Sequence, residues 1–348
     1  MNTLTLQRPD DWHVHLRDGD SLRAVAKFTA QRFGRAIVMP NLMPPITTAA
    51  MAGAYRERIL AALPANSRFD PLLTLYLTDA TTPQEIARAR ATGFVHGAKL
   101  YPAGATTHAD SGVTDVAKLY PVLAQMQEIG MPLLVHGETA RADVDVFDRE
   151  THFIDGVLAP LLERFPGLRV VLEHITTAGA VEFIRTARAG VAATITPQHL
   201  LHNRNAIFSG GIRPHYYCLP ILKRERDRQA LVGAATGGSP RFFLGTDSAP
   251  HARAAKENAC GCAGMFTAHA AIELYAEAFE SAGALNRLQP FASHFGADFY
   301  GLPRHDDTIT LIKEPWVPPE VYDFGDGELV PYRAGESIAW RLAAAEHP

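Results

Sequence analysis

The chain has 348 residues, 47% of them hydrophobic and 20% charged, which is enough to bury the core of one large barrel or of two ordinary domains. Its formal net charge is -4, and no run of lysine or arginine predicts binding to nucleic acid or to an anionic membrane, so small-molecule chemistry is favoured. The N-terminus lacks the features of a signal peptide and no apolar run reaches transmembrane length, so we expect a cytoplasmic protein.

The first informative stretch spans residues 11–18 and contains His13 and His15. Side chains alternate along a strand, so two histidines separated by one residue point to the same side and could reach one metal ion. A His-x-His pattern also occurs by chance. The remaining chain must therefore supply further ligands.

Short apolar runs and helical patterns alternate from there onward. A first helix is expected from about Asp20-Ser21 to Gly34, a second from about Thr48 to Ala62, and a third from Thr82-Pro83 to Gly93. The eight expected strands lie at about 11–18, 35–41, 69–79, 94–100, 131–138, 168–174, 191–196 and 241–247. This alternation predicts a parallel (β/α)8 TIM-type barrel.

Two segments stand outside this alternation. Residues 101–112 are small, polar and glycine-bearing, as is typical of a mobile loop. Residues from about 302 to 348, with a strand-like run at 308–312, are expected to form a C-terminal extension packed on the barrel. We therefore expect residues 1–348 to form a single barrel domain.

The three cysteines give a weak signal. Cys218 stands alone, and Cys260 and Cys262 form a Cys-Gly-Cys pair. The odd count argues against a disulfide framework, and two thiolates without a second pair make a poor metal site. Reduced thiols are the expectation.

Polar residues fall at or near the C-terminal ends of the expected strands, where barrel enzymes build their active sites. They are His13, His15, Asn41, Lys99, His136, His174 and Asp247. Imidazoles and a carboxylate suit zinc or a similar divalent ion. Lys99 is either a salt-bridging spectator, a deprotonated base, or a lysine converted by carbon dioxide to a carbamate, which could bridge two metals.

The order of these motifs carries a family resemblance. The motifs are His13-Val14-His15-Leu16-Arg17, Met39-Pro40-Asn41, Lys99-Leu100-Tyr101-Pro102, Val135-His136-Gly137-Glu138, Leu172-Glu173-His174 and Gly245-Thr246-Asp247-Ser248-Ala249-Pro250-His251. Over nearly the whole chain, this order resembles the amidohydrolase superfamily and, more narrowly, the compact bacterial (class II) dihydroorotases of pyrimidine biosynthesis.

The resemblance implies a binuclear zinc centre with two ions per subunit. His13, His15 and Asp247 would hold one ion, and His136 and His174 the other. Lys99, as N6-carboxylysine, and a hydroxide would bridge them. The hydroxide would be the nucleophile, and Asp247 would act as general base and then as general acid.

The resemblance also implies the substrate contacts. Arg17, Asn41 and His251 would bind the substrate carboxylate, and backbone groups of Leu219 and Ala263 the ring amides. Thr106 and Thr107 would close over the substrate from the loop. The implied reaction interconverts N-carbamoyl-L-aspartate and (S)-dihydroorotate plus water, and the implied assembly is a homodimer.

Two alternatives remain at this point. A hydantoinase or dihydropyrimidinase would share the metal centre, but its substrates lack the ring carboxylate that Arg17, Asn41 and His251 would bind. A catalytically dead scaffold is disfavoured because every metal position is filled. Trp12 is expected to be a packing residue. The other histidines have no matched role and are expected to be structural or solvent-facing, among them His96, His108, His199, His202, His215, His269 and His294.

Overall fold

The computed structural model describes residues 2–107, 109–259, 261–325 and 327–344. His108, Cys260 and residues 345–348, named above, lie outside the described residues. Within the described ranges, no helix is long and apolar enough to cross a membrane.

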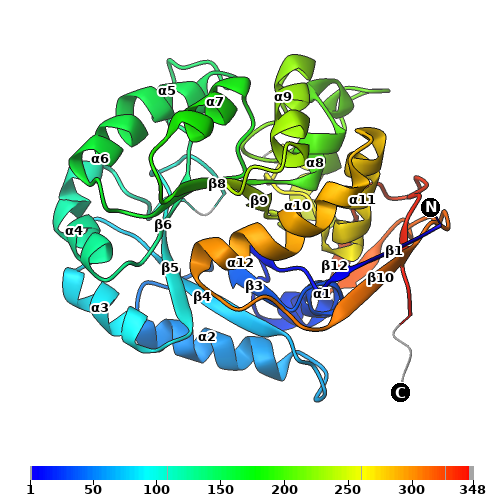
Figure 1. Ribbon diagram of the computed structural model, residues 1–348, viewed down its shortest axis with the longest axis horizontal. Helices are drawn as coiled ribbons and strands as arrows, with labels where there is room; N and C mark the ends of the chain where they lie inside the picture. The colour runs from blue at the N-terminus through cyan, green and yellow to red at the C-terminus, as the bar shows by residue number, and fades with distance from the viewer. Residues whose placement is uncertain (1, 108, 260, 326, 345–348) are drawn as a thin grey trace.

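Eight strands form one sheet in their order along the chain, each parallel to its neighbour. They are β2 (Asp11–Val14), β3 (Arg35–Val38), β4 (Asp70–Tyr76), β5 (Val95–Leu100), β6 (Leu133–His136), β7 (Val170–Glu173), β8 (Val191–Ile195) and β9 (Phe242–Leu244). Helices lie around the outside of these strands (Figure 1). The expected (β/α)8 barrel is confirmed.

The helices follow the strands along the chain. They are α1 (Gly19–Arg32), α2 (Ala49–Ala61), α3 (Pro83–Ala91), α4 (Tyr120–Glu128), α5 (Arg149–Phe153), α6 (Ala159–Arg164), α7 (Ala178–Thr186), α8 (Pro197–Leu201), α9 (Glu225–Thr236), α10 (Arg253–Lys256), α11 (Ala271–Ser281) and α12 (Phe295–Tyr300). Thr48 and Thr82 cap α2 and α3 through their hydroxyls, and the helices begin there as expected. Helix α1 begins earlier than expected, because Asp18 rather than Asp20 or Ser21 provides the cap.

The sheet closes where β2 meets the segment after β9. The His15 amide donates to the Ser248 carbonyl over 3.0 Å, and the Asp247 amide donates to the His13 carbonyl over 2.9 Å. Residues at the C-terminal ends of the first and last barrel strands are thereby joined through their backbones. This pairing fixes the relative positions of three residues that the sequence predicts to be site residues.

A buried apolar cluster fills the barrel interior. It takes one or more residues from seven strands or their ends, namely Trp12, Ile37, Met39, Leu72, Leu134, Val171, Ala192 and Phe243. Trp12 stacks on Tyr300 of α12 with ring centroids 4.6 Å apart, which confirms its expected packing role. A larger cluster lies between the strands and the outer helices. The polar strand ends thus stand on a rigid, closely packed support.

The two ends of the chain pair with each other outside the barrel (Figure 1). Strand β1 (Thr3–Gln7) lies antiparallel to β10 (Thr308–Ile312), which also pairs with β13 (Arg341–Leu342). Strands β11 (Tyr322–Phe324) and β12 (Gly327–Leu329) form a hairpin beside α1. The strand-like run at 308–312 is therefore confirmed, whereas β1 was not predicted because its partner lies about 300 residues away in the chain.

His269 makes a testable contribution to acid sensitivity. This histidine is buried beside Phe266, Trp316 and Tyr322, and burial lowers its pKa from 6.5 to about 3. The unfolded chain therefore binds a proton below about pH 6.5 that the folded chain rejects, so stability falls as pH falls. When the pH is lowered from 6.5 to 5, the free energy of unfolding should fall for both proteins. The fall should be about 2 kcal/mol smaller for His269→Phe than for the wild type.

Urea unfolding at a series of pH values measures this difference. His152→Gln, at an exposed histidine, is the control and should follow the wild-type curve. Parallel curves for His269→Phe and the wild type would show that His269 is not the source of the acid sensitivity.

Candidate metal centre and substrate pocket

The alternation of side chains along the strands brings polar groups to the top of the barrel interior. In β6, Leu134 belongs to the interior cluster, and His136, two residues later, points the same way. In β7, Val171 and Glu173 have the same relation. The interior face of each of these two strands thus changes from apolar to polar at its C-terminal end.

Three candidate site residues have left-handed backbone conformations. The φ angle is 61° at Arg17, 43° at His174 and 46° at Asp247. Non-glycine residues rarely adopt positive φ, and the cost is of the order of 1 kcal/mol. Such conformations concentrate at functional sites, and here each one occurs just beyond a barrel strand.

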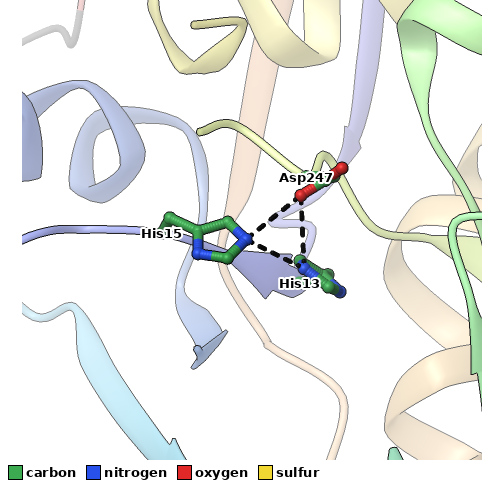
Figure 2. A group of neighbouring side chains, drawn as sticks. All are labelled: His13, His15 and Asp247. Carbon is green, nitrogen blue, oxygen red and sulfur yellow. Dashed lines mark hydrogen bonds and ion pairs between the residues drawn. The ribbon is translucent and has the colours of Figure 1, made fainter. Parts of the chain in front are cut away.

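His13, His15 and Asp247 form a compact group of donor atoms (Figure 2). The Nε2 atoms of the two histidines are 3.3 Å apart. Asp247 Oδ1 lies 3.3 Å from His13 Nε2 and 3.2 Å from His15 Nε2. A tetrahedral zinc ion with ligand distances of about 2.0–2.1 Å separates its ligand atoms by about 3.3–3.4 Å. The spacing of the three donors therefore fits a shared zinc ion.

The charges around this group favour a cation. Burial lowers the pKa of His15 to about 4, which keeps its imidazole neutral and able to donate a lone pair. Although burial opposes it, hydrogen bonds from His13 and His15 hold the pKa of Asp247 well below its usual value. Burial is the largest single influence on His13 and lowers its pKa, but the Glu173 and Asp247 carboxylates together outweigh it and raise this pKa to about 9. The electrostatic potential of the surrounding carboxylates therefore favours positive charge at the point where a metal ion would bind.

Lys99 and two further histidines adjoin this group. The Lys99 ammonium contacts Glu173 Oε2, and Glu173 Oε1 lies 3.1 Å from His13 Nδ1. Burial lowers the pKa of Lys99, which favours the neutral amine. The His174 ring centroid lies 4.9 Å from that of His13 and 4.8 Å from that of His136. All six residues that the sequence suggests as metal ligands are thus brought together.

The same pocket continues towards the residues implied as substrate contacts. Its lining contains Arg17, Asn41, Thr106, Thr107, Leu219, His251 and Ala263 together with four of the histidines and Asp247. Asn41 Oδ1 lies 2.8 Å from His15 Nδ1. Arg17 Nη2 and the Ala263 carbonyl oxygen lie 3.0 and 3.1 Å from His251 Nε2. The Arg17–His251 pair and the candidate metal ligands therefore face the same cavity.

The loop with Thr106 and Thr107 is closed at its base. Ala103 donates to the Val113 carbonyl over 3.0 Å, and Val113 donates to the Tyr101 carbonyl over 2.8 Å. The loop follows β5, the strand that ends beside Lys99, and this brings both threonines to the pocket. Its mobility stays a prediction.

Four residues that contact the site have no role predicted from the sequence. Asp11, Glu138 and Glu173 are fully buried carboxylic acids. Asp11 accepts from the His13 amide and from Thr246, Glu138 Oε2 lies 3.0 Å from His136 Nε2, and Glu173 contacts both His13 and Lys99. Tyr101 lines the pocket. Asp11 and Glu173 could have been identified from the sequence by their charge, because an acidic residue is unusual in an otherwise apolar strand.

The comparisons with known proteins agree with this geometry. Residues 11–316 match the model of the Amidohydrolase family. The dihydroorotase of Alkalilimnicola ehrlichii is 64% identical over 98% of this chain and 100% of its own length. The crystal structure of dihydroorotase in complex with 5-fluoroorotic acid from Saccharomyces cerevisiae has a TM-score of 0.91 at 33% identity and covers 99% of both chains.

A more distant structure shares the fold. The L-hydantoinase (dihydropyrimidinase) from Arthrobacter aurescens has a TM-score of 0.81 at 17% identity, and the match covers 98% of this chain and 83% of that one. At this identity the likeness extends to the fold alone. Family match, sequence identity and site geometry together lead to one conclusion: the chain belongs to the amidohydrolase family and, within it, to the dihydroorotases.

Proposed function

We propose that this chain is a zinc-dependent dihydroorotase, which interconverts N-carbamoyl-L-aspartate and (S)-dihydroorotate plus water in pyrimidine biosynthesis. The observation that carries the proposal is the single pocket in which His13, His15 and Asp247 face the Arg17–His251 pair. The dihydroorotase from Saccharomyces cerevisiae, whose structure contains 5-fluoroorotic acid, supports a ligand of this class: an anionic pyrimidine ring.

The candidate metal ligands form two sets, one on each side of Lys99. His13, His15 and Asp247 would hold one zinc ion and His136 and His174 a second, with Lys99, carboxylated to N6-carboxylysine, between them. Two zinc ions, when bound, lower the pKa of water and polarise the carbonyl that it attacks. Two observations support this assignment: the imidazole of His15 is neutral, and the Nδ1 atom of buried His174 has no hydrogen-bond partner among the described residues.

Asp247 is the residue that moves the proton. Its carboxylate, fixed by His13 and His15, would accept the proton of the attacking water at Oδ1 or Oδ2. It would return that proton to the ring nitrogen when the amide C–N bond breaks. In the direction of ring closure, the same carboxylate would take the proton from the carbamoyl nitrogen.

Arg17, Asn41 and His251 would orient the substrate through its carboxylate. Arg17 is itself held by a hydrogen bond of 2.8 Å from its Nε to the Pro250 carbonyl, which leaves the guanidinium edge beside His251 directed into the pocket. Leu219 and Ala263 would contact the ring amides through their backbones. Thr106 and Thr107 would exclude water from above.

Arg17→Met should separate substrate binding from metal binding. Removing a charge-assisted contact costs about 1.5–3 kcal/mol, so kcat/KM should fall about 10- to 100-fold while the zinc content stays unchanged. Steady-state kinetics and metal analysis on the same sample measure both quantities. Arg23→Met, at an exposed helical arginine, should match the wild type. An unaltered kcat/KM would remove Arg17 from the substrate site.

A substrate panel tests the proposed function itself. The metal-loaded protein is assayed with L-dihydroorotate, dihydrouracil and hydantoin. Turnover of dihydroorotate alone is expected, because the uncharged rings give Arg17 no carboxylate to bind. Preference for the uncharged rings would make the protein a hydantoinase-type amidase, and a zinc-loaded protein inactive on all three would refute cyclic amidase activity.

A homodimer and a cytoplasmic location are further parts of the proposal. The homodimer follows from the family resemblance. Size measurement in solution would test the dimer directly.

A further inference from the structure

Lys256 is a buried lysine that the proposed chemistry does not use. Only 4% of its surface is exposed, and it ends the short helix α10 beside the pocket. Among the described residues, no carboxylate forms an ion pair with its ammonium group. Burying an ammonium group in this way is costly unless its protons are satisfied.

Three backbone carbonyls satisfy this ammonium group. Lys256 Nζ donates to the Gly264 oxygen over 2.6 Å, the Cys262 oxygen over 2.8 Å and the Tyr217 oxygen over 3.1 Å. Cys262 and Gly264 are the two neighbours of Ala263, and Tyr217 lies two residues before Leu219. A single side chain therefore fixes the backbone on both sides of Ala263 and just before Leu219.

The two backbone segments also contact each other and the pocket wall. The Gly264 amide donates to the Tyr217 carbonyl over 3.1 Å, and the Ala263 carbonyl lies 3.1 Å from His251 Nε2. Gly264 has a φ of 149°, and a Cβ atom there would lie 2.5 Å from the Ala249 oxygen and 2.9 Å from His251 Cδ2. The segment is therefore packed closely against residues 249–251, with no room for a side chain at position 264.

We propose that Lys256 is the positioning residue that holds the backbone groups of Leu219 and Ala263 at the spacing required to recognise the amide edge of the substrate ring. The inference rests on the proposed function, because it assigns these backbone groups to substrate recognition. Lys256 touches no reacting atom. It acts through the three carbonyls that it binds and, through Ala263, on His251.

The test measures recognition of one ring amide. Lys256→Met and Lys256→Gln are assayed with L-dihydroorotate and with dihydroorotate methylated on the ring nitrogen outside the scissile bond. The wild type should show a kcat/KM for the methylated substrate that is lower by about tenfold or more, because methylation removes a hydrogen-bond donor. Lys256→Met should raise KM for dihydroorotate about tenfold, change kcat less than about threefold and largely abolish the penalty for methylation.

A purely structural role predicts a different result. It would lower thermal stability and the activity towards both substrates equally, so the methylation penalty would persist and overturn the inference. An absent penalty in the wild type would overturn it too. Lys256→Gln serves the same test if Lys256→Met does not fold. An inactive wild type would refute the proposed function, whereas an active wild type with unchanged Lys256→Met kinetics would refute only the role of Lys256.

Discussion

Asp247→Asn is expected to lower kcat for dihydroorotate by about a thousandfold. The amide keeps the shape of the carboxylate but cannot accept the proton of the attacking water, and general acid–base catalysis contributes about 10²–10⁴ to rates. The backbone should be preserved, because asparagine tolerates the positive φ of 46° at this position better than most residues. A loss of activity in Asp247→Asn can therefore be assigned to catalysis and not to misfolding.

The measurement combines kcat, metal content and circular dichroism. Because Asp247 Oδ1 also belongs to the donor group with His13 and His15, zinc affinity should fall, and kcat is therefore measured at saturating zinc. Asp155→Asn, at an exposed aspartate in the α5–α6 region, should behave as the wild type. A zinc-loaded Asp247→Asn enzyme with more than about a tenth of wild-type kcat would exclude Asp247 as the proton carrier.

Lys99→Ala is expected to reduce both turnover and metal content, each to a small fraction of the wild-type value. The change removes the proposed bridging group and leaves a cavity beside Glu173 and His13, which contact each other over 3.1 Å. A short carboxylic acid such as propionate could occupy that cavity and provide the missing oxygens. We therefore expect partial recovery of activity when zinc and propionate are added together.

The carbamate also has a spectroscopic signature. Wild-type protein equilibrated with ¹³C-bicarbonate should show a carbamate carbon resonance that is absent from Lys99→Ala. Lys27→Ala, at an exposed lysine, should keep the resonance, the zinc and the activity. Wild-type turnover by Lys99→Ala with zinc bound would contradict the bridging role.

The barrel could be predicted because its strands are buried on both faces and appear as short apolar runs. β3 and β7 are fully buried along their lengths, and helix caps such as Thr82 mark where each following helix begins. The site could be found because each candidate ligand ends such a run. When these runs pair as neighbouring parallel strands, their C-terminal ends lie on the same face of the barrel.

The remaining features depend on contacts that no local pattern encodes. Strand β1 forms because Thr3–Gln7 pairs with β10. The role of Lys256 can be inferred only from the fold, which places the carbonyls of residues 217, 262 and 264 around its ammonium group. Glu173 stood beside a predicted ligand in the sequence. Its contacts with His13 and Lys99 required the barrel to close.

The decisive experiment is a zinc titration of metal-depleted protein, with dihydroorotate ring opening followed by ultraviolet absorbance. We expect no turnover without metal and a rise in activity that stops at about two zinc ions per chain, as two ligand sets around Lys99 require. Full activity at about one ion per chain, or activity that is independent of zinc, would exclude a binuclear zinc centre around Lys99.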